Sequence, residues 1–122
     1  MKQVSESEML HRAAAYCSAS ERCIQDVEKK IKAAGLAGEE SDRIVSRLLQ
    51  ERFIDESRFA RYFVNDKLRF NKWGRVKINY EMQRKGIPSS IRSEALEGID
   101  EQEYRSILLS LLKSKKKATR GK

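Results

Sequence analysis

Five polar residues recur along one side of the segment 58–72, and four of them are cationic. Successive members are three, four, four and three positions apart, which places them on one stripe of a helix. They are Arg58, Arg61, Asn65, Arg69 and Lys72. Displayed cations of this kind can neutralise the phosphates of a polyanion and release its counterions. An ordinary solvated helix face has the same polar pattern, so the stripe alone leaves both interpretations open.

A second group of basic residues surrounds Trp73-Gly74, and the only acid between positions 69 and 85 is Glu81. An exposed Trp73 could stack on a base or enter a partner's pocket. Packing between repeats is the favoured role, because an aromatic residue beside a glycine often seals a helix corner. The predicted binding surface for nucleic acid or an acidic protein comprises Arg58, Arg61, Arg69, Lys72, Trp73, Arg75, Lys77, Arg84 and Lys85.

Charge is uneven along the chain, whose net charge is +8. Residues 1–56 hold 9 basic and 11 acidic residues, whereas residues 57–122 hold 17 basic and 7 acidic ones. A lysine-rich C-terminal tail supplies 6 of the 17, which leaves 11 basic residues against 7 acidic ones without it. A basic second half predicts a polyanion or an acidic protein surface as its partner.

Residues that could carry catalysis are scarce. His11 is the only histidine, which excludes a metal centre or an acid–base pair built on two imidazoles. The segment Gly35-Leu36-Ala37-Gly38 lacks the lysine and hydroxyl residue of a nucleotide-binding loop. Cys17 and Cys23 fall on apolar helix faces, which favours buried thiols in a reducing cytoplasm. We therefore expect a non-enzymatic protein with no cofactor and no bound metal.

The binding surface must be positioned by helices, because the chain repeats a helical unit. The segment 54–59 returns, slightly altered, at 99–104, an offset of 45 positions, and glycines at 35 and 86 end comparable segments. A period of this size predicts stacked supersecondary units. The predicted fold is all-α, an elongated array of tandem three-helix repeats that resemble helix-turn-helix units. Its parts are repeat 1 (5–53), repeat 2 (54–100), the first helix of an incomplete third repeat (101–113) and a disordered basic tail (114–122).

Apolar residues at helical spacing give each expected helix a buried side. Ser5 and Asp55 are expected to cap two of these helices. The predicted core residues are Leu10, Ala13, Ala14, Cys17, Ile24, Val27, Ile31, Ala34, Ile44, Val45, Leu48, Leu49, Phe59, Ala60, Phe63, Val64, Leu68, Ile78, Met82, Ile91, Ala95, Leu96, Tyr104, Ile107, Leu108, Leu111 and Leu112.

The segment 76–82 is ambiguous, because its apolar and polar residues alternate as in a half-buried strand. The repeat favours a helix instead. Superposing Gly86 on Gly35 places Ile78 and Met82 on apolar positions of a regular helical pattern, and an isolated strand would have no partner elsewhere in the chain. We predict a helix that begins near Gly74.

The first eight residues are too polar for a signal peptide, and no uncharged apolar run approaches the roughly 20 residues of a membrane span. We expect a cytoplasmic monomer that does not associate with membranes.

The segment 53–64 (Phe-Ile-Asp-Glu-Ser-Arg-Phe-Ala-Arg-Tyr-Phe-Val) resembles the most characteristic stretch of the RecX family of bacterial recombination regulators. Trp73-Gly74, Lys77-Ile78 and Lys85-Gly86-Ile87 add to this resemblance, which extends from about Arg12 to Leu112. Members have tandem three-helix repeats, commonly three. The resemblance implies a regulator that lodges in the groove of the RecA filament and suppresses ATP hydrolysis, strand exchange and the co-protease activity of the SOS response.

Two rival functions from other classes remain open. A stand-alone helical regulator could bind single- or double-stranded DNA directly, because three-helix units can resemble helix-turn-helix modules. An adaptor for an acidic protein would need no nucleic acid. In every case the predicted contact surface rests on charge, because the residues shared with the family are largely core and turn positions.

Overall fold

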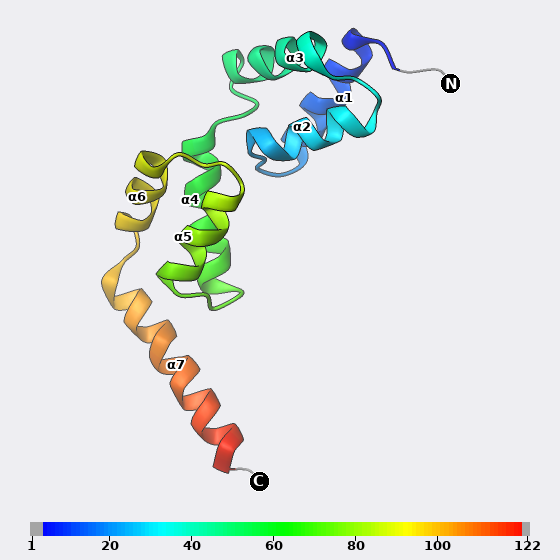
Figure 1. The fold of residues 1–122 in the computed structure, drawn as a ribbon. Helices are drawn as coiled ribbons and strands as arrows, with labels where there is room; N and C mark the ends of the chain where they lie inside the picture. Colours follow the sequence, from blue (N-terminus) through cyan, green and yellow to red (C-terminus); the bar gives the residue numbers. More distant parts are fainter. Residues whose placement is uncertain (1–3, 121–122) are drawn as a thin grey trace.

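The computed structural model describes residues 4–120 of the chain, with side chains described as far as Lys113. All regular structure in this range is helical, which confirms the predicted all-α fold (Figure 1). The helices are α1 (Glu6–Ala19), α2 (Ile24–Ala33), α3 (Gly38–Gln50), α4 (Glu56–Arg69), α5 (Arg75–Arg84), α6 (Ser89–Glu97) and α7 (Glu101–Arg120).

Helices α1, α2 and α3 pack against one another and enclose the first of two hydrophobic cores. The hydroxyl of Ser5 accepts a hydrogen bond from the Glu8 amide at 3.1 Å, so α1 starts at the predicted cap. At the end of α2, Gly35 adopts a φ of 93°, and the Leu36 amide donates to the Ile31 carbonyl. This left-handed turn ends the helix and directs the chain into α3.

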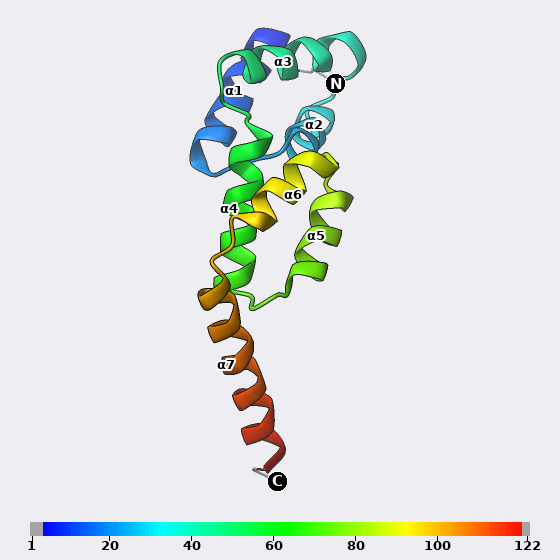
Figure 2. The same ribbon diagram turned by 90° about the vertical axis from the view of Figure 1, so that its left-hand side faces the viewer.

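Helices α4, α5 and α6 form the second unit around the second core (Figures 1 and 2). The Asp55 carboxylate caps α4 by accepting from the Arg58 amide at 3.0 Å. Gly86, at a φ of 81°, ends α5 as Gly35 ends α2. Each unit thus closes its second helix with the same left-handed turn, as expected of a repeated module.

The ambiguous segment 76–82 lies within helix α5, so the prediction from the repeat is confirmed. Ile78 and Met82, four positions apart, are fully buried on one side of the helix. Val76 and Tyr80 are exposed on another side, which explains the alternation that resembles a strand. The alternating pattern reflects a helix with a narrow buried face.

A few predicted core positions are wrong. Leu49 is 40% exposed, and Leu108 and Leu112 are 37% and 63% exposed in the middle of α7, where no further helix among the described residues covers them. In α1, Ala13 and Cys17 are buried as predicted, and Met9 is 1% exposed whereas the predicted Leu10 is only half-buried. The buried face of α1 therefore follows Met9, Ala13 and Cys17 at four-residue spacing.

Helix α7 leaves the second unit and projects away from the first, so the described ends of the chain lie far apart (Figures 1 and 2). It continues to Arg120, whereas the sequence predicted a helix to 113 and a disordered tail over 114–122. Positions 121 and 122 lie outside the described residues. Between residues 4 and 120, no helix is both long enough and apolar enough to cross a lipid bilayer.

Candidate functional site

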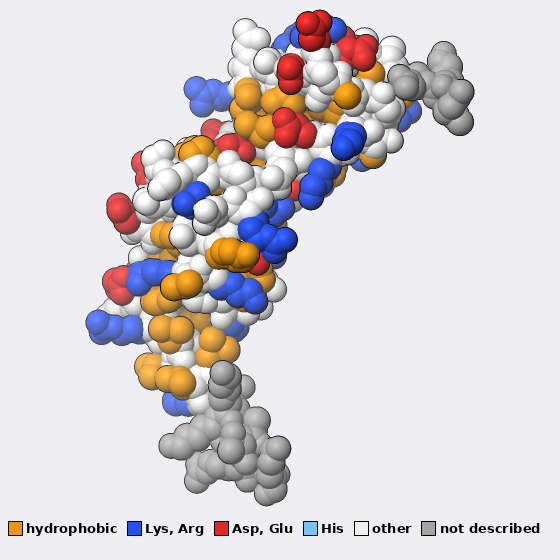
Figure 3. Space-filling view, viewed as in Figure 1, with side chains coloured by type: hydrophobic (Ala, Val, Ile, Leu, Met, Phe, Trp, Pro, Cys, Tyr) orange, Lys and Arg blue, Asp and Glu red, His pale blue; other side chains and the backbone are white. Residues whose placement is uncertain are grey.

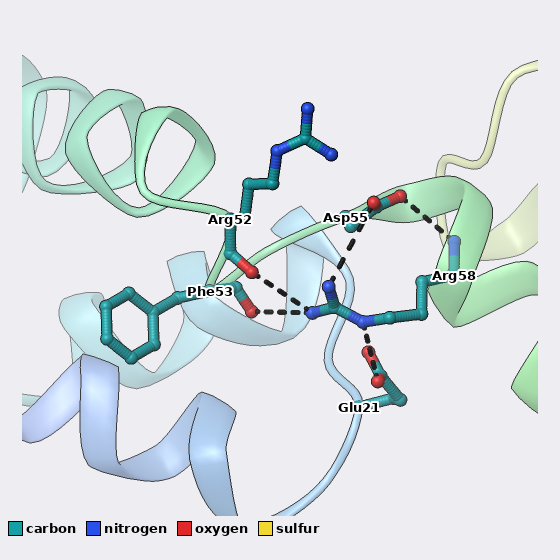
Figure 4. Close-up of polar contacts among 5 residues, drawn as sticks. All are labelled: Glu21, Arg52, Phe53, Asp55 and Arg58. Atoms are coloured by element: carbon teal, nitrogen blue, oxygen red, sulfur yellow. Dashed lines mark hydrogen bonds and ion pairs between the residues drawn. The ribbon is translucent and has the colours of Figure 1, made fainter.

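Arg58 is the centre of the joint between the two repeats (Figure 4). Its Nε donates to the Glu21 carboxylate at 2.7 Å, and one terminal nitrogen lies 3.3 Å from the carbonyl oxygens of both Arg52 and Phe53. Asp55 lies on the other side, 4.0 Å from the guanidinium. Arg58 therefore ties the connection between α3 and α4 to the loop before α2, and its charge is compensated within the chain.

Two further polar contacts cross this joint. The Glu56 carboxylate, at the start of α4, accepts from the Ile24 amide at 3.1 Å, and the Lys85 amine lies 3.1 Å from Asp26. Cys23, from the first repeat, is fully buried in the core of the second. The repeats thus share buried surface as well as charge pairs.

Helix α7 meets the second repeat through an equivalent joint. The first amide of α5, that of Arg75, donates to the Tyr104 hydroxyl at 3.1 Å, just as the first amide of α2 donates to Glu56. Ion pairs Arg69–Glu103, at 2.7 Å, and Arg75–Glu101 complete it. In both joints, a side chain from the next unit's first helix caps the second helix of the preceding unit.

Two carboxylates at the first joint, Asp26 and Asp55, predict a loss of stability in acid, whereas burial raises the pKa of the third, Glu56. Burial favours the neutral form of Asp26, but hydrogen bonds from the Cys23 amide and the Lys85 amine leave its pKa below the ordinary value. The amide of Arg58 likewise lowers the pKa of Asp55. A carboxyl group whose pKa is lowered by folding stabilises the chain above its unfolded pKa, and this contribution disappears as the pH falls through the folded pKa.

We therefore expect urea unfolding to show a lower free energy of unfolding at about pH 3 than at neutral pH. Asp26→Asn should lower stability at neutral pH and flatten the pH dependence, because it removes one of these groups. Asp42→Asn, at an exposed carboxyl of α3, is the matched control. Equal pH profiles for Asp26→Asn and the unmodified chain would show that the Asp26 carboxylate does not stabilise the joint.

The eight cations among the nine predicted surface residues divide into two groups. Most of the cations have an acidic partner within the chain, so their charge is not wholly available to a ligand. The paired residues are Arg58, Arg69, Arg75, Arg84 and Lys85. Among the described side chains, no carboxylate lies within ion-pair distance of Arg61, Lys72 or Lys77, and all three are exposed.

Trp73 is half-buried and packs against the core of the second repeat, at the corner between α4 and α5, whereas the sequence favoured packing between the repeats. Its ring meets Phe63 edge-on with the centroids 6.3 Å apart. The amine of Lys77 lies 4.6 Å from the indole centroid, and that of Lys67 lies 5.3 Å away. The indole therefore contacts one aromatic ring and two amines, and Lys77 lies at the edge of the second core.

Sequence reasoning missed the residues that form the joints. Glu21, Asp26 and Glu56 are acidic, whereas the predicted surface was chosen for its basic residues. Lys67 was also absent from that predicted surface. One signal was present, because Glu56 directly follows the predicted cap Asp55 at the start of the repeated segment. A side chain there is well placed to meet the preceding repeat.

The described residues contain no cluster of three or more histidine, cysteine, aspartate or glutamate side chains that could hold a metal ion. Both cysteines are free and buried, and burial raises the pKa of the Cys23 thiol to about 11. Such a thiol is a poor nucleophile or metal ligand at neutral pH.

Comparison with known proteins gives consistent matches. A family profile described as "RecX, second three-helix domain" matches residues 55–96. The regulatory protein RecX of Prosthecochloris aestuarii is 33% identical over 91 residues, which cover 75% of this chain and 60% of that protein. RecX of Lactobacillus johnsonii is 27% identical over 84% of this chain and 38% of that protein. The chain thus spans less than two thirds of the length of these relatives.

Solved structures match in fold. A crystal structure of regulatory protein RecX superposes with a TM-score of 0.85 at 21% identity, over 96% of this chain and 58% of that one. RecX from Lactobacillus salivarius superposes with a TM-score of 0.81 at 19% identity, over 96% and 76% of the two chains. The repeated three-helix units, the profile match and the curated relatives agree: this chain belongs to the RecX family of regulatory proteins.

Proposed function

We propose that this chain binds the RecA filament and inhibits RecA's ATP hydrolysis, strand exchange and SOS co-protease activities. The relationship to RecX regulatory proteins carries this proposal. Because the chain spans only part of those relatives, its own activity has to be tested directly.

Shape and charge support the proposal. The repeats follow one another along an elongated body whose axis α7 extends, a form that suits a long partner better than a small substrate (Figure 1). Arg61, Lys72 and Lys77 are exposed, have no ion-pair partner among the described side chains, and all belong to the second repeat or its turns. A RecA–DNA filament offers both phosphates and acidic side chains as partners for such cations. We propose that these three side chains make the principal electrostatic contacts.

The primary experiment measures DNA-stimulated ATP hydrolysis by RecA on single-stranded DNA while this chain is titrated. We expect inhibition that weakens as ionic strength rises, because exposed charge pairs are screened by salt. An unchanged ATPase rate at several-fold molar excess over RecA would reject the proposal for this chain.

A stand-alone DNA-binding function is the second candidate, favoured by the net charge of +8 and the three-helix units. Titrating fluorescent single-stranded and duplex DNA with the chain, without RecA, separates the two. Tight, sequence-selective binding to duplex DNA would favour the second candidate. Weak and unselective DNA binding together with inhibition of RecA would favour the first.

A further inference from the structure

The turn between α4 and α5 carries the most exposed aromatic side chain among the described residues. Phe70 is 80% exposed, whereas Tyr80 and Tyr62, the next in order, are 57% and 46% exposed. The turn lies at the end of the second unit that is remote from the first (Figures 1 and 2). A single exposed apolar residue is ordinary on a protein surface, so its surroundings decide whether it is a binding site.

Backbone hydrogen bonds fix the turn on both sides of Phe70. The Phe70 amide donates to the Asp66 carbonyl at 2.9 Å. The Lys67 carbonyl accepts from the amides of Asn71 and Trp73 at 3.2 and 3.1 Å, and the Trp73 ring packs against the second core. Phe70 is therefore held outward by ordered backbone, and a ligand that covers its ring has little of the chain to order.

Lys72 holds a backbone conformation that favours glycine. Its φ is 59°, and among the described residues only Arg52 shares a positive φ without being a glycine. A side chain in this conformation costs free energy that glycine would not. Lys72 is exposed and has no ion-pair partner among the described side chains, so no contact within the described chain accounts for a lysine there. An unfavourable conformation kept at an exposed cation favours a role toward a ligand.

The surroundings of Phe70 are strongly basic, because residues 67–77 hold five basic residues and no acidic one. Three of these, Lys67, Arg69 and Arg75, are paired with carboxylates within the chain, whereas Lys72 and Lys77 are not, among the described side chains. On the face shown in Figure 3, basic and apolar side chains lie next to one another over the second unit. An aromatic ring beside cations suits a ligand with both a π-face and negative charge.

The exposure of Phe70 does not depend on further repeats. Superposing Gly86 on Gly35 places Phe70 on Ala19, at the end of α1. Ala19 is exposed although a complete three-helix unit follows its own. Phe70 is likewise exposed with α7 packed against α4. A following repeat that sat on the second as the second sits on the first would leave this turn free.

We propose that the turn 70–72 is a binding site for single-stranded nucleic acid, in which the Phe70 ring stacks on one base and the Lys72 amine contacts a neighbouring phosphate. A single strand offers free base faces, whereas a duplex stacks its bases on one another. The contact is insensitive to sequence, because every base has a π-face. From the sequence, Trp73 was the candidate for stacking on a base, but that ring is half-buried, and Phe70 presents the free one.

Fluorescence anisotropy without RecA tests the stacking, with labelled oligodeoxythymidine and oligouridine as probes. We expect both single strands to bind more tightly than a duplex of the same length. Phe70→Ala should weaken their binding about tenfold, the effect of one lost stacked base. Phe70→Leu should weaken it equally, because leucine keeps apolar volume but has no π-face. Tyr62→Ala, at an exposed aromatic residue of α4, should change nothing.

Three results would overturn the stacking proposal. They are duplex binding as tight as that of the single strands, binding retained in Phe70→Leu, and equal loss in Phe70→Ala and Tyr62→Ala.

Lys72→Gly tests the phosphate contact. The slope of the logarithm of the association constant against the logarithm of salt concentration should become shallower by about 0.7, as expected for one phosphate contact on a single strand. The melting temperature should rise, because glycine adopts a positive φ without steric cost. Phe70→Ala should leave the slope unchanged, because its ring is uncharged. An unchanged slope for Lys72→Gly, or a lower melting temperature, would overturn the role assigned to Lys72.

The RecA ATPase assay separates this proposal from the proposed function. If Phe70→Ala weakened inhibition of RecA but left binding to single strands unchanged, Phe70 would enter a pocket of a protein partner, and the stacking proposal would fail. Binding of single strands through Phe70 by a chain that leaves the RecA ATPase unchanged would support the stacking proposal and reject only the proposed function.

Discussion

Replacing Phe63 by alanine is expected to lower the free energy of unfolding by about 3–5 kcal/mol, the range measured for buried aromatic truncations. Phe63 is only 6% exposed, in the middle of α4. Its ring stacks on Phe59 with the centroids 5.7 Å apart and meets Trp73 edge-on. Removing the ring leaves a cavity between α4 and the turn before α5, which these rigid neighbours cannot fill.

The matched control is Tyr62→Ala, at the adjacent position of the same helix. Tyr62 is 46% exposed, so its truncation should cost about 1 kcal/mol or less. Urea unfolding followed by far-UV circular dichroism gives the free energies. Fluorescence adds a local probe, because Trp73 is the only tryptophan and touches Phe63. If Phe63→Ala lowered the free energy of unfolding no more than Tyr62→Ala does, the stability of the second core would not depend on the Phe63 ring.

The helices could be predicted from the sequence because their signals are local. In α4, all five predicted core residues are buried: Phe59, Ala60, Phe63, Val64 and Leu68. Apolar spacing specifies which side of a helix is buried, and a cap specifies where the helix begins. For α5 the local signal was misleading, and only the comparison of Gly35 with Gly86 identified the helix. For this segment the repeat of the three-helix unit identified the helix, whereas the spacing of the apolar residues did not.

The charge pairs could not be predicted, because they join residues far apart in the sequence. Arg58 belongs to a cationic stripe when α4 is considered alone, yet its partner Glu21 lies 37 positions away. Arg69 is likewise paired with Glu103, 34 positions away. Helical spacing shows which side chains share a face, but it contains no information about which helix covers that face. Much of the predicted binding surface is therefore used in holding the repeats together.

Both joints use residues of the repeated segment. Glu56 is the third residue of the first copy and Tyr104 the sixth residue of the second, and each caps the second helix of the preceding unit. The two positions do not correspond, and one group is a carboxylate and the other a phenol, so each joint caps its helix with a different residue. In a repeat array each unit contacts only its neighbours, so contacts of this kind set the orientation of one unit against the next.

The double substitution Lys72→Glu and Lys77→Glu is expected to weaken inhibition of RecA by about tenfold or more at low ionic strength, if the proposed function is correct. Both lysines are exposed and have no ion-pair partner among the described side chains. Reversing their charge therefore replaces attraction to an anionic partner by repulsion without breaking an ion pair within the chain. Arg69 is less suitable for this test, because its reversal would also break the contact with Glu103. The difference in RecA inhibition between the double variant and the unmodified chain should become smaller as the salt concentration rises, because salt screens exposed charges.

Two controls make the result specific. Lys29→Glu with Lys32→Glu alters two exposed lysines of α2 and shifts the net charge equally, by four units from +8 to +4. This control should inhibit RecA like the unmodified chain, because α2 lies in the first repeat. Stability should change by about 1 kcal/mol or less in the test variant, which loses only the contact of Lys77 with the Trp73 ring. Equal weakening by both double variants would show that overall charge, rather than this surface of the second repeat, governs the interaction.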